Sequence, residues 1–234
     1  MPIEAPQPSL QPATRSADAR IAEWISALVV VVIFVGFAKN FYLRAWLGTR
    51  PLILTAWVHG IVMSAWLVLF AIQLSMVSRR RLKVHRKLGQ WSIWLAVPVV
   101  AVGIVTIFVR TRIVFPQATS MTSALVFVAF DGLSLLLFGA LVALAWAYRL
   151  VPAAHRRLMV MAMVALLPPA YGRTVEYVRR DHIEIIVVGL MVATTLMFVV
   201  VDARRSHRVQ PASWIPGLLI VLVSGVAYAA QVSI

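Results

Sequence analysis

Apolar residues occur in long runs along this chain, and short segments rich in arginine, lysine and proline separate one run from the next. Each run is about 20 residues long, which is the length of helix that crosses a hydrocarbon layer ~30 Å thick. The runs do not alternate polar with apolar positions, so the strands of a membrane barrel are excluded. The pattern predicts an all-α polytopic membrane bundle with seven transmembrane helices, at about 22–41, 52–76, 88–109, 122–148, 158–177, 183–201 and 214–232.

The composition supports a membrane protein. Of the 234 residues, 62% are hydrophobic and only 13% are charged, and the mean hydropathy is +0.90. The absence of cysteine excludes disulfides, thiolate metal sites and thiol nucleophiles. Residues 1–21 contain four prolines among polar residues and no apolar stretch of signal-peptide length. We therefore expect a disordered cytoplasmic tail over 1–21 that is not cleaved, followed by one transmembrane domain over 22–234.

The 22 Lys and Arg residues lie in small groups between the apolar runs. Fourteen lie on the side of the N-terminal tail and eight on the other side. By the positive-inside rule, the N-terminus is expected in the cytoplasm and the C-terminus outside. This distribution predicts contact with the lipid bilayer and no nucleic-acid binding. The orientation depends on the fifth run, which Pro168 and Pro169 interrupt; if that helix does not cross, every later segment inverts.

A His-Arg-x-Leu motif precedes both the third and the fifth apolar run. His85 begins the first copy and His155 begins the second, seventy residues later. The second and fourth runs also start seventy residues apart. The spacing predicts a parallel repeat of helices 2–3 and 4–5, related by an axis along the membrane normal.

The shared motif places His85 and His155 at one depth on the cytoplasmic side. Such a pair is a candidate for the axial ligands of haem b, because the iron takes imidazole nitrogens and nearby arginines pair with the propionates. The alternative is an interfacial anchor in which His and Arg contact anionic headgroups. A relay of two haems would need a second pair, and His59 and His182 lie about two turns apart in depth. The cofactor therefore stays open, with haem b as the candidate.

A second group of polar residues is expected in the outer third of the bilayer. It consists of His59, Asp131, Arg173 and Glu176, on three predicted helices. An isolated ionisable side chain at such depth costs several kcal/mol, so the shared depth predicts a polar pocket open to the outside. The alternative is a set of separate residues that extend to the interface.

The second predicted helix carries His59, Trp66 and Gln73 at intervals of seven residues, which places them on one stripe. A stripe of this kind faces protein rather than lipid, and we favour a helix–helix interface over a proton path. Other site classes lack their signatures. The lysines lie near helix ends, which excludes a retinal Schiff base, and neither a His-Glu-x-x-His zinc motif nor a nucleotide-binding loop is present.

The motifs around His59, Gln73, His85 and His155, together with Pro168-Pro169, resemble small bacterial multi-pass membrane proteins of unassigned function. The second motif is also similar to one in membrane proteins associated with assembly of haem-containing terminal oxidases, and the helices with histidines are similar to b-type cytochromes. The resemblance implies a bacterial inner membrane and supplies no enzymatic activity. Three functions stay open: a protein whose outward-facing pocket binds a small molecule, lipid or proton; a b-type haem electron-transfer protein; and a non-catalytic subunit or assembly factor of a larger membrane complex.

Overall fold

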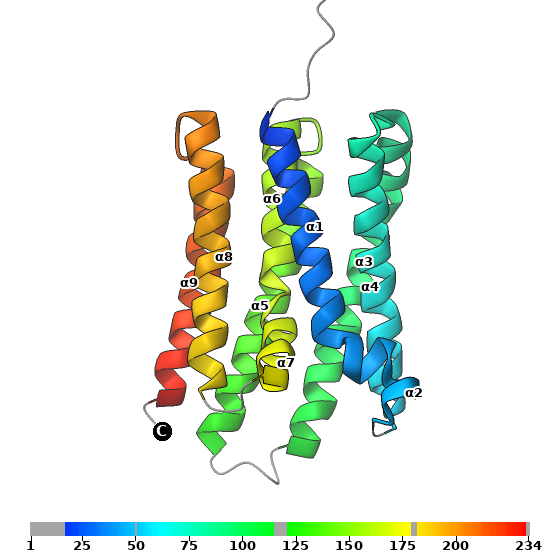
Figure 1. Ribbon diagram of the computed structural model, residues 1–234, viewed down its shortest axis with the longest axis vertical. Helices are drawn as coiled ribbons and strands as arrows, with labels where there is room; N and C mark the ends of the chain where they lie inside the picture. Colours follow the sequence, from blue (N-terminus) through cyan, green and yellow to red (C-terminus); the bar gives the residue numbers. More distant parts are fainter. Residues whose placement is uncertain (1–16, 50, 115–120, 179–181, 233–234) are drawn as a thin grey trace, which may run out of the picture.

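The computed structural model describes residues 17–49, 51–114, 121–178 and 182–232, and in these ranges the chain is helical with no strand. Figure 1 shows the helices side by side along the long axis of the molecule. In chain order the elements are α1 Ala17–Phe37, the π-helical turn η1 Ala38–Tyr42, α2 Arg44–Leu47, α3 Leu54–Ser78, α4 Leu82–Val114, α5 Met121–Ala147, α6 Pro152–Ala165, α7 Pro168–Val178, α8 Ile183–Ser206 and α9 Pro211–Val232. The predicted all-α polytopic bundle is confirmed.

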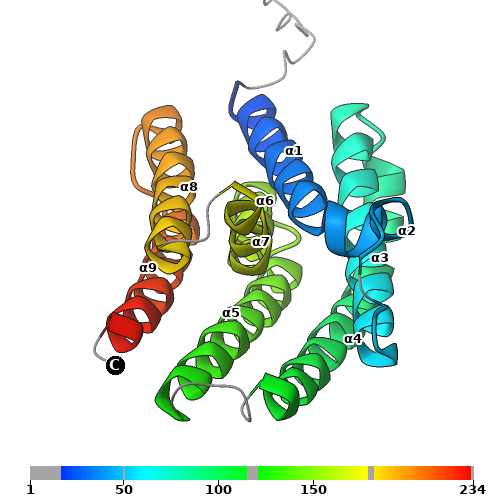
Figure 2. The same ribbon diagram turned by 60° about the horizontal axis from the view of Figure 1, so that its bottom comes forward.

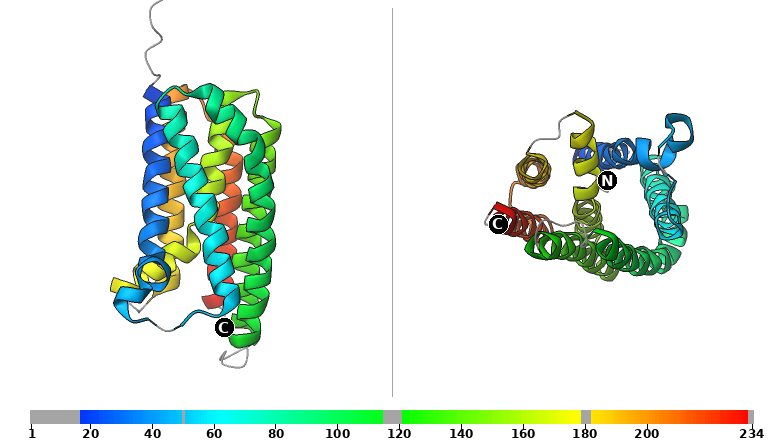
Figure 3. Two further views of the ribbon diagram at one scale, coloured as in Figure 1. Left: turned by 90° about the vertical axis from the view of Figure 1, so that its right-hand side faces the viewer. Right: turned by 90° about the horizontal axis from the view of Figure 1, so that it is seen from below.

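Six helical segments in the described ranges are long and apolar enough to cross a membrane: α1 continued into η1, α3, α4, α5, α8 and α9. The pair α6 and α7 meets the same test only when the two helices are taken together, across a bend of 45°, so the described ranges contain six candidate spans, or seven if this pair is one span. Together α6 and α7 lead from one end of the bundle to the other, so that α1 begins at the end opposite to that where α9 finishes (Figures 1 and 3). The chain is therefore an integral multi-pass membrane protein.

The bend follows from the two adjacent prolines. A proline has no N–H to donate to the carbonyl four residues earlier, and its ring clashes with that carbonyl. The last turn of α6 therefore has hydrogen bonds to the carbonyl three residues earlier, from Leu166 N–H to Met163 O at 3.2 Å and from Leu167 N–H to Val164 O at 3.0 Å. Pro168 then starts α7, where a first-turn proline costs no hydrogen bond.

α6 is the central helix of the bundle. It contacts α5, α9, α1 and α8, and it lies among these helices in the end-on view of Figure 3. Eight of its fourteen residues are buried. One of them is Arg157, which donates from Nε to both carboxylate oxygens of Asp202 on α8 at 2.8 Å. Ser213 on α9 donates to the same carboxylate at 2.6 Å, so this ion pair joins three helices.

The end of α1 packs closely on α7, which Figure 2 shows in front of α6. A Cβ atom on Gly36 would lie 2.5 Å from the carbonyl oxygen of Ala170. Tyr177 donates its hydroxyl to Gly36 O at 3.0 Å, and the Arg173 guanidinium lies over the Phe37 ring at 4.5 Å. The segment after the Pro-Pro break is thus held by α1.

Several helix ends differ from the sequence prediction. α1 begins at Ala17, so the predicted tail is helical over 17–21, and residues 1–16 lie outside the described residues. α4 begins at Leu82, six residues before the predicted start, because its first turns carry the basic motif and are polar rather than apolar. His85 and His155 each lie three residues after the start of their helix, as a repeat would require. The two hairpins differ beyond the motif, since α4 runs unbroken for 33 residues whereas α6 ends after 14.

Candidate functional site

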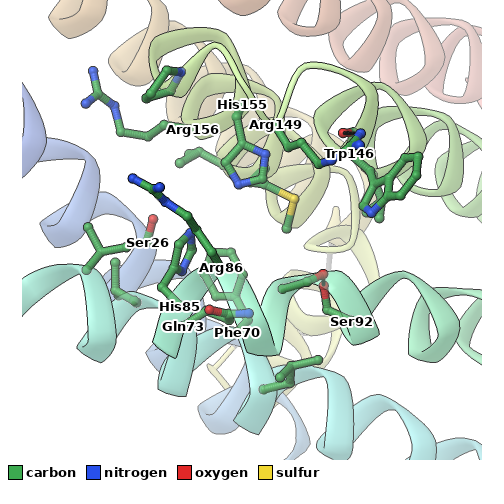
Figure 4. Close-up of a pocket in the computed structure, with 18 of the residues that line it drawn as sticks. Ser26, Phe70, Gln73, His85, Arg86, Ser92, Trp146, Arg149, His155 and Arg156 are labelled. Carbon is green, nitrogen blue, oxygen red and sulfur yellow. Dashed lines mark hydrogen bonds between the residues drawn. The ribbon is translucent and has the colours of Figure 1, made fainter. Parts of the chain in front are cut away.

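His85 on α4 and His155 on α6 face each other inside the bundle. Their ring centroids are 6.3 Å apart and the ring planes make an angle of 71°. Figure 4 shows the two rings pointing toward each other from their separate helices. The expectation that the two motifs place their histidines at one level is met, and the fold also turns both side chains toward the same space.

The two rings line a cavity of about 530 Å³, within the usual size range of small-molecule sites. Its walls come from α1, α3, α4, α5 and α6, at the end of the bundle where α1, α4 and α6 begin. Most of the wall is apolar or aromatic, with Trp66, Leu69, Phe70, Ile93, Val142 and Met159 among the lining residues. We call this space the histidine cavity.

Three arginines also line the histidine cavity: Arg86, Arg149 and Arg156. The Arg149 guanidinium lies 4.1 Å from the centre of the Trp146 ring and donates to Trp146 O at 3.1 Å. Glu23 is the one acidic residue in the lining, so the cavity has an excess of basic groups. Arginine side chains beside an apolar chamber suit a ligand with an apolar body and carboxylate or phosphate groups at one edge.

Hydrogen bonds orient both imidazoles. His155 Nδ1 lies 2.8 Å from the carbonyl oxygen of Ala145. A carbonyl only accepts, so in the neutral ring of His155 the proton lies on Nδ1 and Nε2 holds a lone pair. His85 Nδ1 lies 2.6 Å from the side-chain amide of Gln73 on α3.

The distance between the His85 and His155 rings would allow both to bind one metal ion that lies between them. Roughly 2.0–2.1 Å separate a metal ion from an imidazole nitrogen, and the ring centre lies about 1 Å further, so two imidazoles on opposite sides of an ion have centroids about 6 Å apart. The observed 6.3 Å agrees with this spacing. In the ranges that the structure describes, no three His, Cys, Asp or Glu side chains form a metal-binding group. An ion held by this pair would therefore have to bring its other ligands, as haem iron does.

The predicted outer residues gather in another part of the bundle. His59 on α3 and Asp131 on α5 both lie near enough to Arg173 on α7 to interact with it electrostatically, and Arg110 on α4 acts on both Asp131 and Arg173. Within the described ranges, no hydrogen bond or ion pair joins Asp131 to Arg173. Arg173 instead donates to Pro169 O at 2.9 Å. The shared outer pocket stays a prediction.

Two other residues of the outer prediction have distinct surroundings. Glu176 is exposed at the end of α7 and interacts with Arg173 only through its charge. His59 Nδ1 is buried, and no hydrogen-bond partner for it exists among the described residues. His182, the residue considered for a second haem, is exposed at the start of α8.

The residues of the predicted stripe on α3, His59, Trp66 and Gln73, lie in different surroundings. Trp66 is buried, donates to Met163 Sδ on α6 at 3.3 Å and packs edge-on against Phe138 of α5. This contact confirms the predicted helix–helix interface at Trp66. Gln73, one interval further, reaches the histidine cavity, which the sequence reasoning did not anticipate. The Arg157–Asp202 pair was also missed, because nothing in the sequence relates two residues so far apart.

Comparison with protein-family models, with curated proteins and with solved structures finds no match for this chain.

Proposed function

We propose that this chain is a membrane haem protein in which His85 and His155 would hold a b-type haem. The observation that supports the proposal is the pair of imidazoles at 6.3 Å in an apolar cavity of about 530 Å³. A haem supplies one-electron redox chemistry when it is bound.

The chain's own residues would serve the ligand in three ways. The two histidines would hold the metal, and the bond from His155 Nδ1 to Ala145 O would keep Nε2 available for it. The apolar part of the wall would contact the macrocycle. Arg86, Arg149 and Arg156 would provide charge-assisted hydrogen bonds for the propionates.

The test is a hemin titration of the purified full chain in detergent, followed by absorbance. We expect one hemin per chain and the spectrum of a six-coordinate, low-spin haem that sharpens on reduction. His85→Ala and His155→Ala should each abolish that spectrum. His207→Asn is the matched control, because it removes an exposed histidine from the same end of the bundle and asparagine tolerates its positive φ of 53°. A low-spin spectrum that survives both alanine variants would contradict the proposal.

The membrane and the orientation form part of the same proposal. The histidine cavity would lie on the cytoplasmic side of a bacterial inner membrane, since the basic turns between α3 and α4, α5 and α6, and α8 and α9 lie at its end of the bundle (Figure 1). Colourless protein that co-purifies with other membrane subunits would favour the assembly or subunit role instead.

A second candidate function is supported by the outer group. In the described structure the Nδ1 of His59 is buried without a hydrogen-bond partner, and Arg173 acts electrostatically on both His59 and Asp131, which suits a small polar ligand or a proton. Isothermal titration with small carboxylates should give binding in the wild type that Arg173→Gln abolishes and that His85→Ala leaves intact. Equal binding by wild type and Arg173→Gln would remove this candidate.

A further inference from the structure

The side-chain amide of Gln73 lies between His85 and the backbone N–H of Gly89. When its oxygen and nitrogen are assigned so that each donor faces an acceptor, Nε2 donates to His85 Nδ1 at 2.6 Å and to His85 O at 3.2 Å, and Oε1 accepts from the Gly89 N–H at 2.9 Å. The reverse orientation would place the amide NH₂ group against the Gly89 N–H, so that two donors would face each other. The pattern of donors and acceptors therefore assigns Nε2 to the side of His85 in the ligand-free protein.

This orientation determines which nitrogen of His85 carries the proton. A neutral imidazole has one donor and one acceptor nitrogen. Because Nδ1 accepts from Gln73, the proton of His85 lies on Nε2. His155 has the opposite tautomer, with its proton on Nδ1 opposite Ala145 O. Of the two rings, only His155 has a free Nε2 lone pair in the ligand-free protein.

We propose that Gln73 is a positioning residue whose amide rotates by half a turn when His85 binds a metal. The inference rests on the proposed haem site. For His85 Nε2 to ligate, the proton must lie on Nδ1, where it needs an acceptor. Rotation of the amide turns Oε1 toward Nδ1 and supplies that acceptor, at the cost of the contact with Gly89. Metal-ligating histidines almost always donate their other N–H in this way, and Ala145 O already accepts from His155.

The first test needs no haem. Nitrogen-15 NMR of the ligand-free full chain, labelled at histidine and measured at mildly alkaline pH, reports the tautomer of each imidazole. We expect the Nε2–H form for His85 and the Nδ1–H form for His155, with the His85 signals assigned by their loss in His85→Ala. Gln73→Glu should switch His85 to the Nδ1–H form, because a carboxylate only accepts. Gln90→Glu, the same change on α4, should leave both tautomers unchanged. An Nδ1–H form of His85 in the wild type would overturn the inference.

The second test follows the ligand. Gln73→Leu should weaken hemin affinity by about 10–100-fold, the usual effect of losing the hydrogen-bond partner of a ligating histidine. Gln73→Glu should retain binding and shift the midpoint potential to more negative values, because a carboxylate makes the ligand more basic. Wild-type affinity and potential in both variants would contradict the role of Gln73 even if haem binds. If no variant or wild type binds hemin, the proposed function fails, while the NMR result still decides the tautomer.

Discussion

At the scale of single residues, the two arginines of the second motif have different roles. Arg156 lines the histidine cavity, whereas Arg157 is 6% exposed and donates from Nε to both carboxylate oxygens of Asp202. A guanidinium buried among apolar helices is tolerated only with a partner that satisfies its charge and its donors. The motif thus combines a cavity residue with a residue that joins α6 to α8.

Replacement of one member of the Arg157–Asp202 pair should lower the free energy of unfolding. Asp202→Asn leaves Arg157 without its counter-charge, and breaking a buried pair typically costs ~3–5 kcal/mol. The double variant Arg157→Met with Asp202→Leu should recover most of the loss, since no charge is then left unpaired. Thermal unfolding in detergent measures both. Arg204→Gln, an exposed change two residues from Asp202, is the control and should alter stability by less than about 0.5 kcal/mol. An Asp202→Asn variant as stable as this control would contradict the buried pair.

At the scale of the helices, the break in the fifth span is stabilised by α1. The prolines end α6, and α7 then packs on the last turn of α1 through Gly36, Tyr177 and Arg173. The sequence predicts the position of the break, because a Pro-Pro pair has a local effect on the backbone. It does not predict that α7 lies against α1, because that contact depends on the arrangement of helices far apart in the chain.

Gly36 should be sensitive to a single methyl group. In Gly36→Ala the new Cβ would lie 2.5 Å from Ala170 O and 2.7 Å from its Cα, so the two helices must separate. Overpacking of this kind costs roughly 1–3 kcal/mol, and the thermal midpoint should fall. Gly189→Ala is the matched control on α8, where a Cβ would meet nothing within 4 Å. Its stability should be unchanged or higher, because alanine is the better helix former. Equal midpoints for the two variants would show that α1 and α7 do not approach so closely.

At the scale of the whole molecule, the hydropathy of the chain predicts the class of fold because a helix that crosses lipid must satisfy its own backbone and present apolar side chains. The repeat of the His-Arg-x-Leu motif also predicts that His85 and His155 lie at one level. The chamber between them, the contact from Gln73 and the Arg157–Asp202 pair could not be predicted. Each depends on which face of a helix turns inward. In a helix that is apolar on nearly all sides, the sequence does not indicate that face.

The orientation in the membrane is a prediction for the molecule as a whole. An odd number of crossings, seven, would place the two termini on opposite sides of the membrane. Fourteen basic residues on the N-terminal side against eight on the other predict that the N-terminal side is cytoplasmic. A reporter inserted after Arg80 should be active in the cytoplasm, and one fused after Ile234 should be active outside. Cytoplasmic activity of both reporters would mean that α6 and α7 together do not cross the membrane.

The most direct measurement of the haem proposal is the haem content of the protein as it is isolated from membranes of cells supplied with a haem precursor. One haem b per chain is expected in the wild type, with the low-spin absorbance of two imidazole ligands, and none in the variant that lacks both His85 and His155. Wild-type protein that is folded, stable and free of haem, or a double variant that keeps its haem, would contradict the proposal.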